Sequence, residues 1–241
     1  MNSLSLGSNH PQVSLDFLTN VPLFAGLDQS IRGEAACLMQ YRAFGSGMTI
    51  FHQDMPGTTL YLMAEGFVRT YSIGQTGQEF TYDIYGAFDI FGELSLMDNG
   101  YHSSTCITMT PIKTWLLSRD NLFALMHKHS VLMRQMLGLI AYRVRSATRK
   151  SEVMAFQDVQ GRLIYELLNL AARMGKPGED GTQIDVPLTQ HELASLVGAT
   201  RESVNKVLTM FRTQNLIKIS GTTVTIVDRT GLERIYLERG R

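Results

Sequence analysis

The sequence of 241 residues has few cysteines, no long apolar run and no net charge. Its two cysteines, Cys37 and Cys106, are too few and too far apart for a disulfide framework or an iron–sulfur centre. No apolar run approaches the ~20 residues of a membrane-spanning helix, and the polar N-terminus does not resemble a signal peptide. We therefore expect a protein of the reducing cytoplasm that does not enter a membrane.

Patterns of catalytic chemistry are also missing. None of the six histidines stands in an HExxH or nucleophile-elbow motif, and the two cysteines have no metal-ligand spacing. The acidic residues Asp83, Asp89 and Glu93 have no identifiable partner for general acid–base work. The sequence thus predicts a binding protein with no metal and no catalytic residues, rather than an enzyme.

The absence of net charge conceals a division along the chain. Residues 1–118 hold 4 Lys/Arg and 10 Asp/Glu, a net charge of −6, whereas residues 119–241 hold 18 and 12, a net charge of +6. Because phosphate groups attract cations, a basic C-terminal half is typical of nucleic-acid binding.

Residues 187–208, PLTQHELASLVGATRESVNKVL, have the pattern of two short helices joined by a tight turn. Thr189 and Glu192 form a capping box, and Gly198 allows the left-handed backbone that a sharp corner needs. Thr200 is placed to cap the second helix. This arrangement predicts a helix-turn-helix, which places its second helix in the major groove of double-stranded DNA.

The second helix begins with side chains that can read base edges, since Arg and Lys bind guanine and Glu accepts from cytosine. The predicted base readers are Arg201, Glu202, Asn205 and Lys206. Side chains at the helix starts are expected to contact phosphates. The predicted phosphate contacts are Thr189, Gln190, Thr200 and Ser203. Arg201 and Glu202 alone would fit an ordinary charged helix, but the preceding capped helix and turn favour DNA reading.

The first half of the chain alternates short β-rich runs with glycines. Strands are predicted at 49–51, 59–65, 67–73, 79–84, 104–110 and 113–117. Many short strands with glycine turns indicate a sandwich or barrel. We expect residues 1–16 to be disordered and residues 17–129 to form this domain, which begins with a short helix and a turn over 17–27.

A long helix is predicted over residues 130–154, after a shorter helix that Ser118 caps and that ends at Lys128. Small and apolar residues recur in it at spacings of four and three. They are Met133, Leu137, Ile140, Val144, Ala147, Ser151 and Met154. This heptad seam predicts a parallel homodimer, and reading a palindrome also requires two copies. The alternative is one amphipathic helix packed on its own sheet.

The remaining segments complete a C-terminal domain over residues 158–229, separated from the long helix by a hinge, so that 130–157 forms the dimerisation helix and hinge. Asp158 is placed to cap a helix that ends at Met174. We expect a surface loop at 175–181, a strand at 183–186, and a hairpin formed by 216–219 and 223–227. The tail, 230–241, is expected to form a short helix with a capping box of Thr230 and Glu233.

Two stretches carry a resemblance to a known family. LTQHELASLVGATRESVNKVLTMFRTQNLI with the following hairpin resembles the winged helix-turn-helix of the Crp/Fnr transcription regulators. FGELSLMDNG, residues 91–100, resembles the phosphate-binding cassette of their cyclic-nucleotide-binding domain. The resemblance covers residues 17–227 and implies an α+β fold: an N-terminal jelly-roll β domain, a long dimerisation helix and a C-terminal winged helix-turn-helix. It further implies a palindromic operator with TGTGA-like half-sites, and RNA polymerase as a partner.

The resemblance also implies a small anionic effector in the jelly roll. The implied ligand-binding residues are Gly92, Glu93, Leu94, Ser103, Ser104, Arg143 and Thr148. The family's cyclic-nucleotide binders carry an arginine directly before Ser104, where this chain has Ser103, and His102 is the nearest candidate to replace that cation. Of two adjacent hydroxyl residues that reach the adenine in those sensors, only Thr148 is kept, beside Ala147.

Three possibilities for the effector therefore stay open. It is a cyclic nucleotide, or another small anion such as a cyclic dinucleotide or a 2-oxo acid, or the dimer is active without any ligand. Arg143 favours the second, because the nitrogen-control branch of the family has an arginine at that position. Activation and repression are not distinguished, since the outcome depends on where the operator lies.

Overall fold

The computed structural model describes residues 12–239, which divide into two compact units. The first comprises the chain up to Val68, Tyr85–Ser103 and Ile107–Ala141; the second comprises Arg69–Ile84, Ser104–Cys106 and the chain from Tyr142 onward. Residues 1–11 of the expected disordered segment lie outside the described residues. Helix α1 (Leu15–Asn20) begins inside that segment, because the Ser14 hydroxyl accepts a hydrogen bond from the Phe17 amide and caps it.

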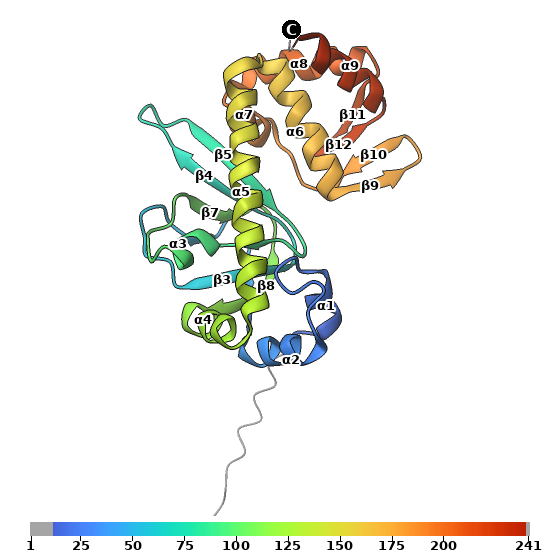
Figure 1. Cartoon of the computed structure of the whole chain (residues 1–241). Helices are drawn as coiled ribbons and strands as arrows, with labels where there is room; N and C mark the ends of the chain where they lie inside the picture. Colours follow the sequence, from blue (N-terminus) through green and yellow to red (C-terminus); the bar gives the residue numbers. More distant parts are fainter. Residues whose placement is uncertain (1–11, 240–241) are drawn as a thin grey trace, which may run out of the picture. The chain divides into compact units, whose positions relative to one another are not determined.

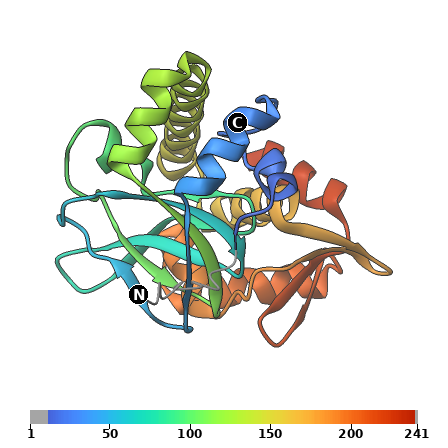
Figure 2. The ribbon, with the colours of Figure 1, turned by 90° about the horizontal axis from the view of Figure 1, so that it is seen from below.

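Four helices surround one apolar core in the first unit: α1, α2 (Gln29–Leu38), α4 (Arg119–Lys128) and the start of α5. Figure 2 shows α1, α2 and α4 beside the N-terminal part of α5, on one side of the strands. Leu18, Phe24 and Leu122 are fully buried there, and each large apolar side chain contributes about 1.5–3 kcal/mol by leaving water. Helix α2 was not predicted, because its buried face consists largely of small residues, Ala35 and Ala36, with Ile31.

Eight strands form two four-stranded sheets, as expected for a jelly roll. The first sheet has the order β1 (Gln40–Phe44), β8 (Ile112–Ser118), β3 (Thr59–Glu65) and β6 (Ile90–Phe91). The second has the order β2 (Thr49–Phe51), β7 (Thr105–Thr108), β4 (Val68–Ile73) and β5 (Glu79–Tyr85). The sequence predicted every strand except β1 and β6. Strand β1 has no buried residue to create an alternating pattern, and β6 has only two residues.

Helix α5 (Ser130–Phe156) is a single helix of 27 residues, about 40 Å long at ~1.5 Å per residue (Figure 1). It confirms the predicted long helix and extends it by two residues. Leu132 and Met136 are buried in the first unit's core, whereas Met133, Leu137 and Val144 are 48%, 65% and 60% exposed. The predicted seam thus includes apolar side chains that this chain leaves in contact with solvent. Within residues 12–239, no helix is both long enough and apolar enough to cross a membrane.

The C-terminal part contains α6 (Val159–Met174), α7 (Gln190–Val197), α8 (Arg201–Thr213) and α9 (Arg229–Arg239). Asp158 caps α6 as predicted, since its carboxylate accepts from the Gly161 amide at 2.9 Å. Strands β11 (Ile217–Ser220) and β12 (Thr223–Ile226) form the predicted hairpin, here called the wing. Val204 and Phe211 of α8 are fully buried, so α8 is anchored by its apolar face.

Two local predictions were wrong. Residues 175–181 are not a loop: β9 (Gly175–Gly178) pairs with β10 (Gly181–Ile184), which itself pairs with β12. Glycines and Pro177 suggested a turn, but an edge strand tolerates proline and covers the open edge of β10. The cap of α9 is Asp228, whose carboxylate accepts from the Gly231 amide, while Glu233 pairs with Arg229. Thr230 is therefore inside α9 and forms no capping box.

Candidate DNA-reading surface and effector cassette

The turn between α7 and α8 is built by local hydrogen bonds. Thr189 and Glu192 form the predicted capping box at the start of α7. Gly198 ends α7 with φ of 60°, in the left-handed region, and a Cβ there would lie 3.0 Å from Met154 Cε. Thr200 then caps α8 by accepting from the Ser203 amide at 3.2 Å. These contacts fix where the first turn of α8 begins.

The predicted base readers of that turn are exposed. Arg201 and Glu202 occupy the first two positions of α8, and Glu202 pairs with Lys206 at 2.8 Å across one helical turn. Both members of this pair are more than three-quarters exposed, so the pair adds little stability and its charges can exchange partners. The Arg201 guanidinium donates instead to Nδ1 of His191 at 3.1 Å.

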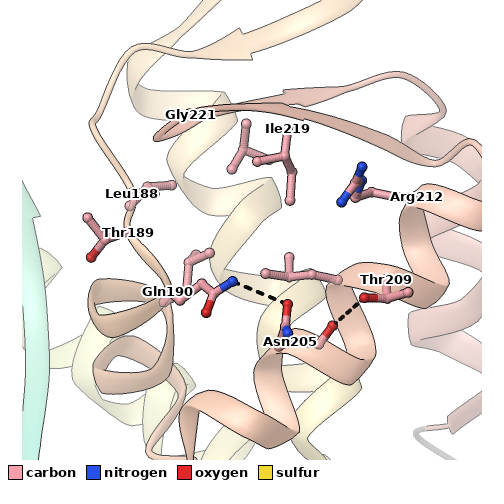
Figure 3. A pocket seen from close by; sticks show the side chains of 11 residues that line it. Leu188, Thr189, Gln190, Asn205, Thr209, Arg212, Ile219 and Gly221 are labelled. Atoms are coloured by element: carbon pink, nitrogen blue, oxygen red, sulfur yellow. Dashed lines mark hydrogen bonds between the residues drawn. The ribbon is translucent and has the colours of Figure 1, made fainter.

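Two residues with different predicted roles are bonded to each other. Gln190, a predicted phosphate contact, donates to Oδ1 of Asn205, a predicted base reader, at 3.2 Å (Figure 3). The Thr209 hydroxyl donates to the Asn205 carbonyl at 2.9 Å. Together with Arg212 and Gly221 of the wing, these side chains line a pocket between α7, α8 and the wing. Asn205 therefore also links the two helices of the motif.

The cassette lies on β6 and α3 (Glu93–Met97) in the first unit. Gly92 caps α3 with φ of 84°, and a Cβ there would lie 2.8 Å from the Thr59 carbonyl oxygen, so glycine is required. Glu93 is 3% exposed. Leu94 is 44% exposed and Ser103 is also exposed, which places both on the surface of the cassette.

Comparison with known proteins agrees with both regions. Residues 41–129 match the family described as cyclic nucleotide-binding domain, and residues 161–235 match the Crp-like helix-turn-helix domain. A CRP-like cAMP-activated global transcriptional regulator of Mycobacterium tuberculosis is 33% identical over 219 residues, 91% of this chain and 98% of the relative. The chain belongs to the Crp/Fnr family of transcription regulators.

Two further comparisons agree with this assignment. The cyclic AMP receptor protein of Thermus thermophilus is 30% identical over 214 residues, 89% of this chain and 96% of that protein. The solved structure of FixK2 from Bradyrhizobium japonicum has a TM-score of 0.75 at 19% identity, over 81% of this chain and 96% of that one, and supports the fold. The chain is thus a Crp/Fnr-type DNA-binding regulator with a cyclic-nucleotide-binding domain, in a family of regulators rather than enzymes.

His102 of this regulator's cassette is buried against two neighbouring side chains. The His102 ring stacks on Phe51 at 3.7 Å between ring centroids, and its Nδ1 lies 3.2 Å from the Ser95 hydroxyl. Burial lowers the pKa of the His102 imidazole, because the charged form loses its hydration. This shift favours the neutral ring further, which argues against His102 as the candidate to replace the missing arginine.

The other implied ligand-binding residues, Ser104, Arg143 and Thr148, belong to the second unit. Ser104, at the start of its short segment, is 8% exposed. Arg143 lies 3.4 Å from the carboxylate of Asp83, which also binds Arg173 at 2.6 Å. Thr148 is exposed, and its hydroxyl donates to the Val144 carbonyl along α5. The charge of Arg143 is thus partly compensated by Asp83.

A buried ion pair lies within the same second unit. Lys150 binds Glu166 at 2.8 Å, and its ammonium also donates to the Thr81 and Tyr82 carbonyls. Burial raises the pKa of the Glu166 carboxyl, and Lys150 opposes this shift. Neither residue was assigned a binding or structural role from the sequence.

One contact of the reading surface was likewise missing from the prediction. His191 stands between Gln190 and Glu192 in the motif, yet no sequence pattern gave it a role. Its partners, Glu79 and Arg201, lie 112 and 10 residues away. Only the folded chain brings the three together.

Proposed function

We propose that this regulator is a homodimer that binds an inverted repeat through α8, with Arg201 and Lys206 reading guanines and Glu202 reading the cytosine opposite a guanine. The observation that supports this most directly is the exposed start of α8, whose first two turns present these three side chains beyond the capped turn. Two-fold symmetry then requires half-site centres about 34 Å, or roughly 10–11 bp, apart. The half-sites are TGTGA-like, and RNA polymerase is the expected further partner.

The homodimer is supported by the exposed part of the α5 seam. Met133, Leu137 and Val144 lie at heptad spacing and are about half exposed or more. A parallel pairing of two α5 helices removes these side chains from water. Two copies also place two α8 helices on one duplex, as reading a palindrome requires.

The effector is proposed as a small anion bound by the cassette. The names of the Mycobacterium tuberculosis and Thermus thermophilus relatives refer to cyclic AMP, which favours a cyclic nucleotide. Ser103 in place of an arginine and the neutral His102 favour a different anion, such as a cyclic dinucleotide or a 2-oxo acid. The packing of His102 against Phe51 and Ser95 also favours a second candidate, a dimer that binds DNA without ligand.

Selection of binding sites from random DNA tests the DNA-reading part. We expect an inverted repeat, and we expect Arg201→Ala to lower affinity for it by ~1–3 kcal/mol per half-site while barely changing affinity for unrelated DNA. Glu202→Ala should relax the preference at one base pair per half-site. The proposal that α8 reads bases is contradicted if the selected sites contain no inverted repeat. It is also contradicted if Arg201→Ala lowers affinity for the inverted repeat and for unrelated DNA equally.

The effector is tested by the thermal stability of the full-length protein with a panel of cyclic mononucleotides, cyclic dinucleotides and 2-oxo acids. A ligand at 100 times its Kd adds about 2.7 kcal/mol to stability. A shift with only one class identifies the effector. No shift with any class, together with full operator binding, supports the ligand-independent dimer.

A further inference from the structure

Strand β5 places polar side chains against the helices of the second unit at alternate positions. Glu79 lies 3.1 Å from His191 of α7, and the Thr81 hydroxyl lies 2.7 Å from the Ser195 hydroxyl of α7. Asp83 binds Arg173 of α6 at 2.6 Å. Residues i, i+2 and i+4 of a strand point to the same face. This face of β5 is therefore bonded to the helix-turn-helix and to α6.

The carboxylate of Glu79 is fixed by a buried arginine on the neighbouring strand. Arg69 of β4 is 7% exposed and binds Glu79 at 2.6 Å. The same guanidinium donates to the Thr81 hydroxyl at 3.2 Å, and the Arg69 carbon Cζ lies 4.4 Å from the centre of the Tyr71 ring. Glu79 thus has little freedom to move, unlike a carboxylate on an open surface.

His191 connects this fixed carboxylate to the base-reading helix. Its Nε2 lies 3.1 Å from Glu79, and its Nδ1 lies 3.1 Å from the Arg201 guanidinium. An arginine only donates hydrogen bonds, so Nδ1 must accept, and the proton of the neutral ring is then on Nε2, which donates to Glu79. Along the series Arg69, Glu79, His191 and Arg201, each hydrogen-bond donor therefore faces an acceptor.

The partner of Arg201 leaves its binding capacity intact. The guanidinium has five N–H donors and uses one of them for the hydrogen bond to His191. A bidentate contact with guanine needs only two. Because His191 accepts as a neutral ring, it does not cancel the arginine charge as a carboxylate would. Lys206, by contrast, is paired directly with Glu202. The contact with His191 restrains Arg201 without neutralising it.

We propose that Glu79 and His191 are positioning residues for Arg201, and that this brace, comprising Arg69, Glu79 and His191, sets how strongly the regulator discriminates its operator. The inference rests on the proposed role of Arg201 as a base reader. A side chain held in its binding orientation loses less conformational freedom on association. Since β5 belongs to the segment that matches the cyclic nucleotide-binding domain, the brace also joins a strand of the sensing domain to the reading helix.

The test compares two substitutions of His191 in the full-length protein. His191→Gln keeps a polar atom near the Nε2 position, toward Glu79, but has none near Nδ1; His191→Asn keeps one near Nδ1, toward Arg201. The readout is the ratio of affinities for the selected operator and for a duplex of the same composition in scrambled order. We expect His191→Gln to lower this ratio about two- to tenfold, the range of one hydrogen bond. His191→Asn should keep more of it.

Two controls separate the brace from other effects. His52→Gln makes the same change at an exposed histidine of the first unit and should leave the ratio unchanged. In an Arg201→Ala background, His191→Gln should have no further effect, because the residue that it positions is gone. Far-ultraviolet circular dichroism and thermal unfolding establish that each variant is folded.

The outcomes distinguish the brace from the proposed function. If Arg201→Ala lowers the ratio but His191→Gln does not, the brace is wrong and Arg201 still reads bases. A further loss from His191→Gln in the Arg201→Ala background overturns the brace as well, since His191 then acts elsewhere. If Arg201→Ala itself leaves the ratio unchanged, the base-reading role is wrong and the brace falls with it.

Discussion

The reading helix and the effector cassette treat charge in opposite ways. Helix α8 exposes Arg201 and Glu202 in its first turn and Lys206 in its second, where they can reach another molecule. The cassette buries Glu93 and His102, and its surface carries Leu94 and Ser103. DNA recognition depends on exposed side chains of one helix, which a sequence motif can name. The proposed effector recognition depends instead on how side chains pack within the cassette, which no short motif determines.

The largest expected effect concerns the two-fold assembly that a palindromic reading surface requires. The double variant Ile140→Glu with Val144→Glu places two carboxylates per chain in the proposed α5 seam. In the dimer these like charges would lie together in a tight interface, where water cannot solvate them. We expect monomers in sedimentation velocity and a loss of palindrome affinity of at least about 100-fold. This is the loss expected when one half-site must be bound without the other.

The matched control is Ser146→Glu, which adds a carboxylate at an exposed position of the same helix outside the seam. It should stay dimeric and keep operator affinity within a few-fold. A double variant that remains dimeric would mean that α5 is not the interface.

A second, smaller effect is expected from a substitution that places a cation on the surface of the cassette, as helix α8 already has on its own surface. Ser103→Arg restores the arginine that the family's cyclic-nucleotide binders carry before Ser104. A charge-assisted bond to a phosphate is worth ~1.5–3 kcal/mol, so we expect cyclic AMP to bind about 10- to 100-fold more tightly in calorimetry. Ser103→Gln, of similar length without charge, should give little gain. An unchanged affinity in Ser103→Arg would mean that the cradle is shaped for another ligand.

The sequence predicted best what short spacings determine. The capping box of Thr189, the cap at Thr200 and the glycine turn at Gly198 depend on residues three or four apart, and the structure contains all of them. The helix over 130–154 was predicted for the same reason, since its pattern repeats many times. The roles assigned to individual DNA- and ligand-binding residues remain predictions.

Features that depend on distant residues could not be predicted. His191 has a partner on β5, 112 residues away. The pKa of His102 is lowered because folding places the ring against Phe51 and buries it. In each case the deciding interaction comes from tertiary packing, which leaves no periodic signal in the chain.

The smallest effect tests the buried state of His102 through the pH dependence of stability. Burial lowers the pKa of His102 in the folded protein, whereas the unfolded chain titrates near the ordinary value of ~6.5. Above this value the ring is neutral in both states and stability is complete. Below it the unfolded chain binds a proton that the folded chain resists, so stability falls as the pH falls toward the folded pKa.

Replacing the ring by a group that does not titrate removes this dependence. His102→Asn keeps a polar atom near Nδ1 for Ser95, and its unfolding free energy should fall by less between pH 7.5 and 5.5 than that of the parent. The difference is at most about 1.4 kcal/mol per pH unit below ~6.5, measured by urea unfolding at each pH. Loss of the stacking on Phe51 lowers stability at both pH values and cancels in the comparison. If His102→Asn keeps the parent's pH dependence, His102 is not the group whose burial resists protonation.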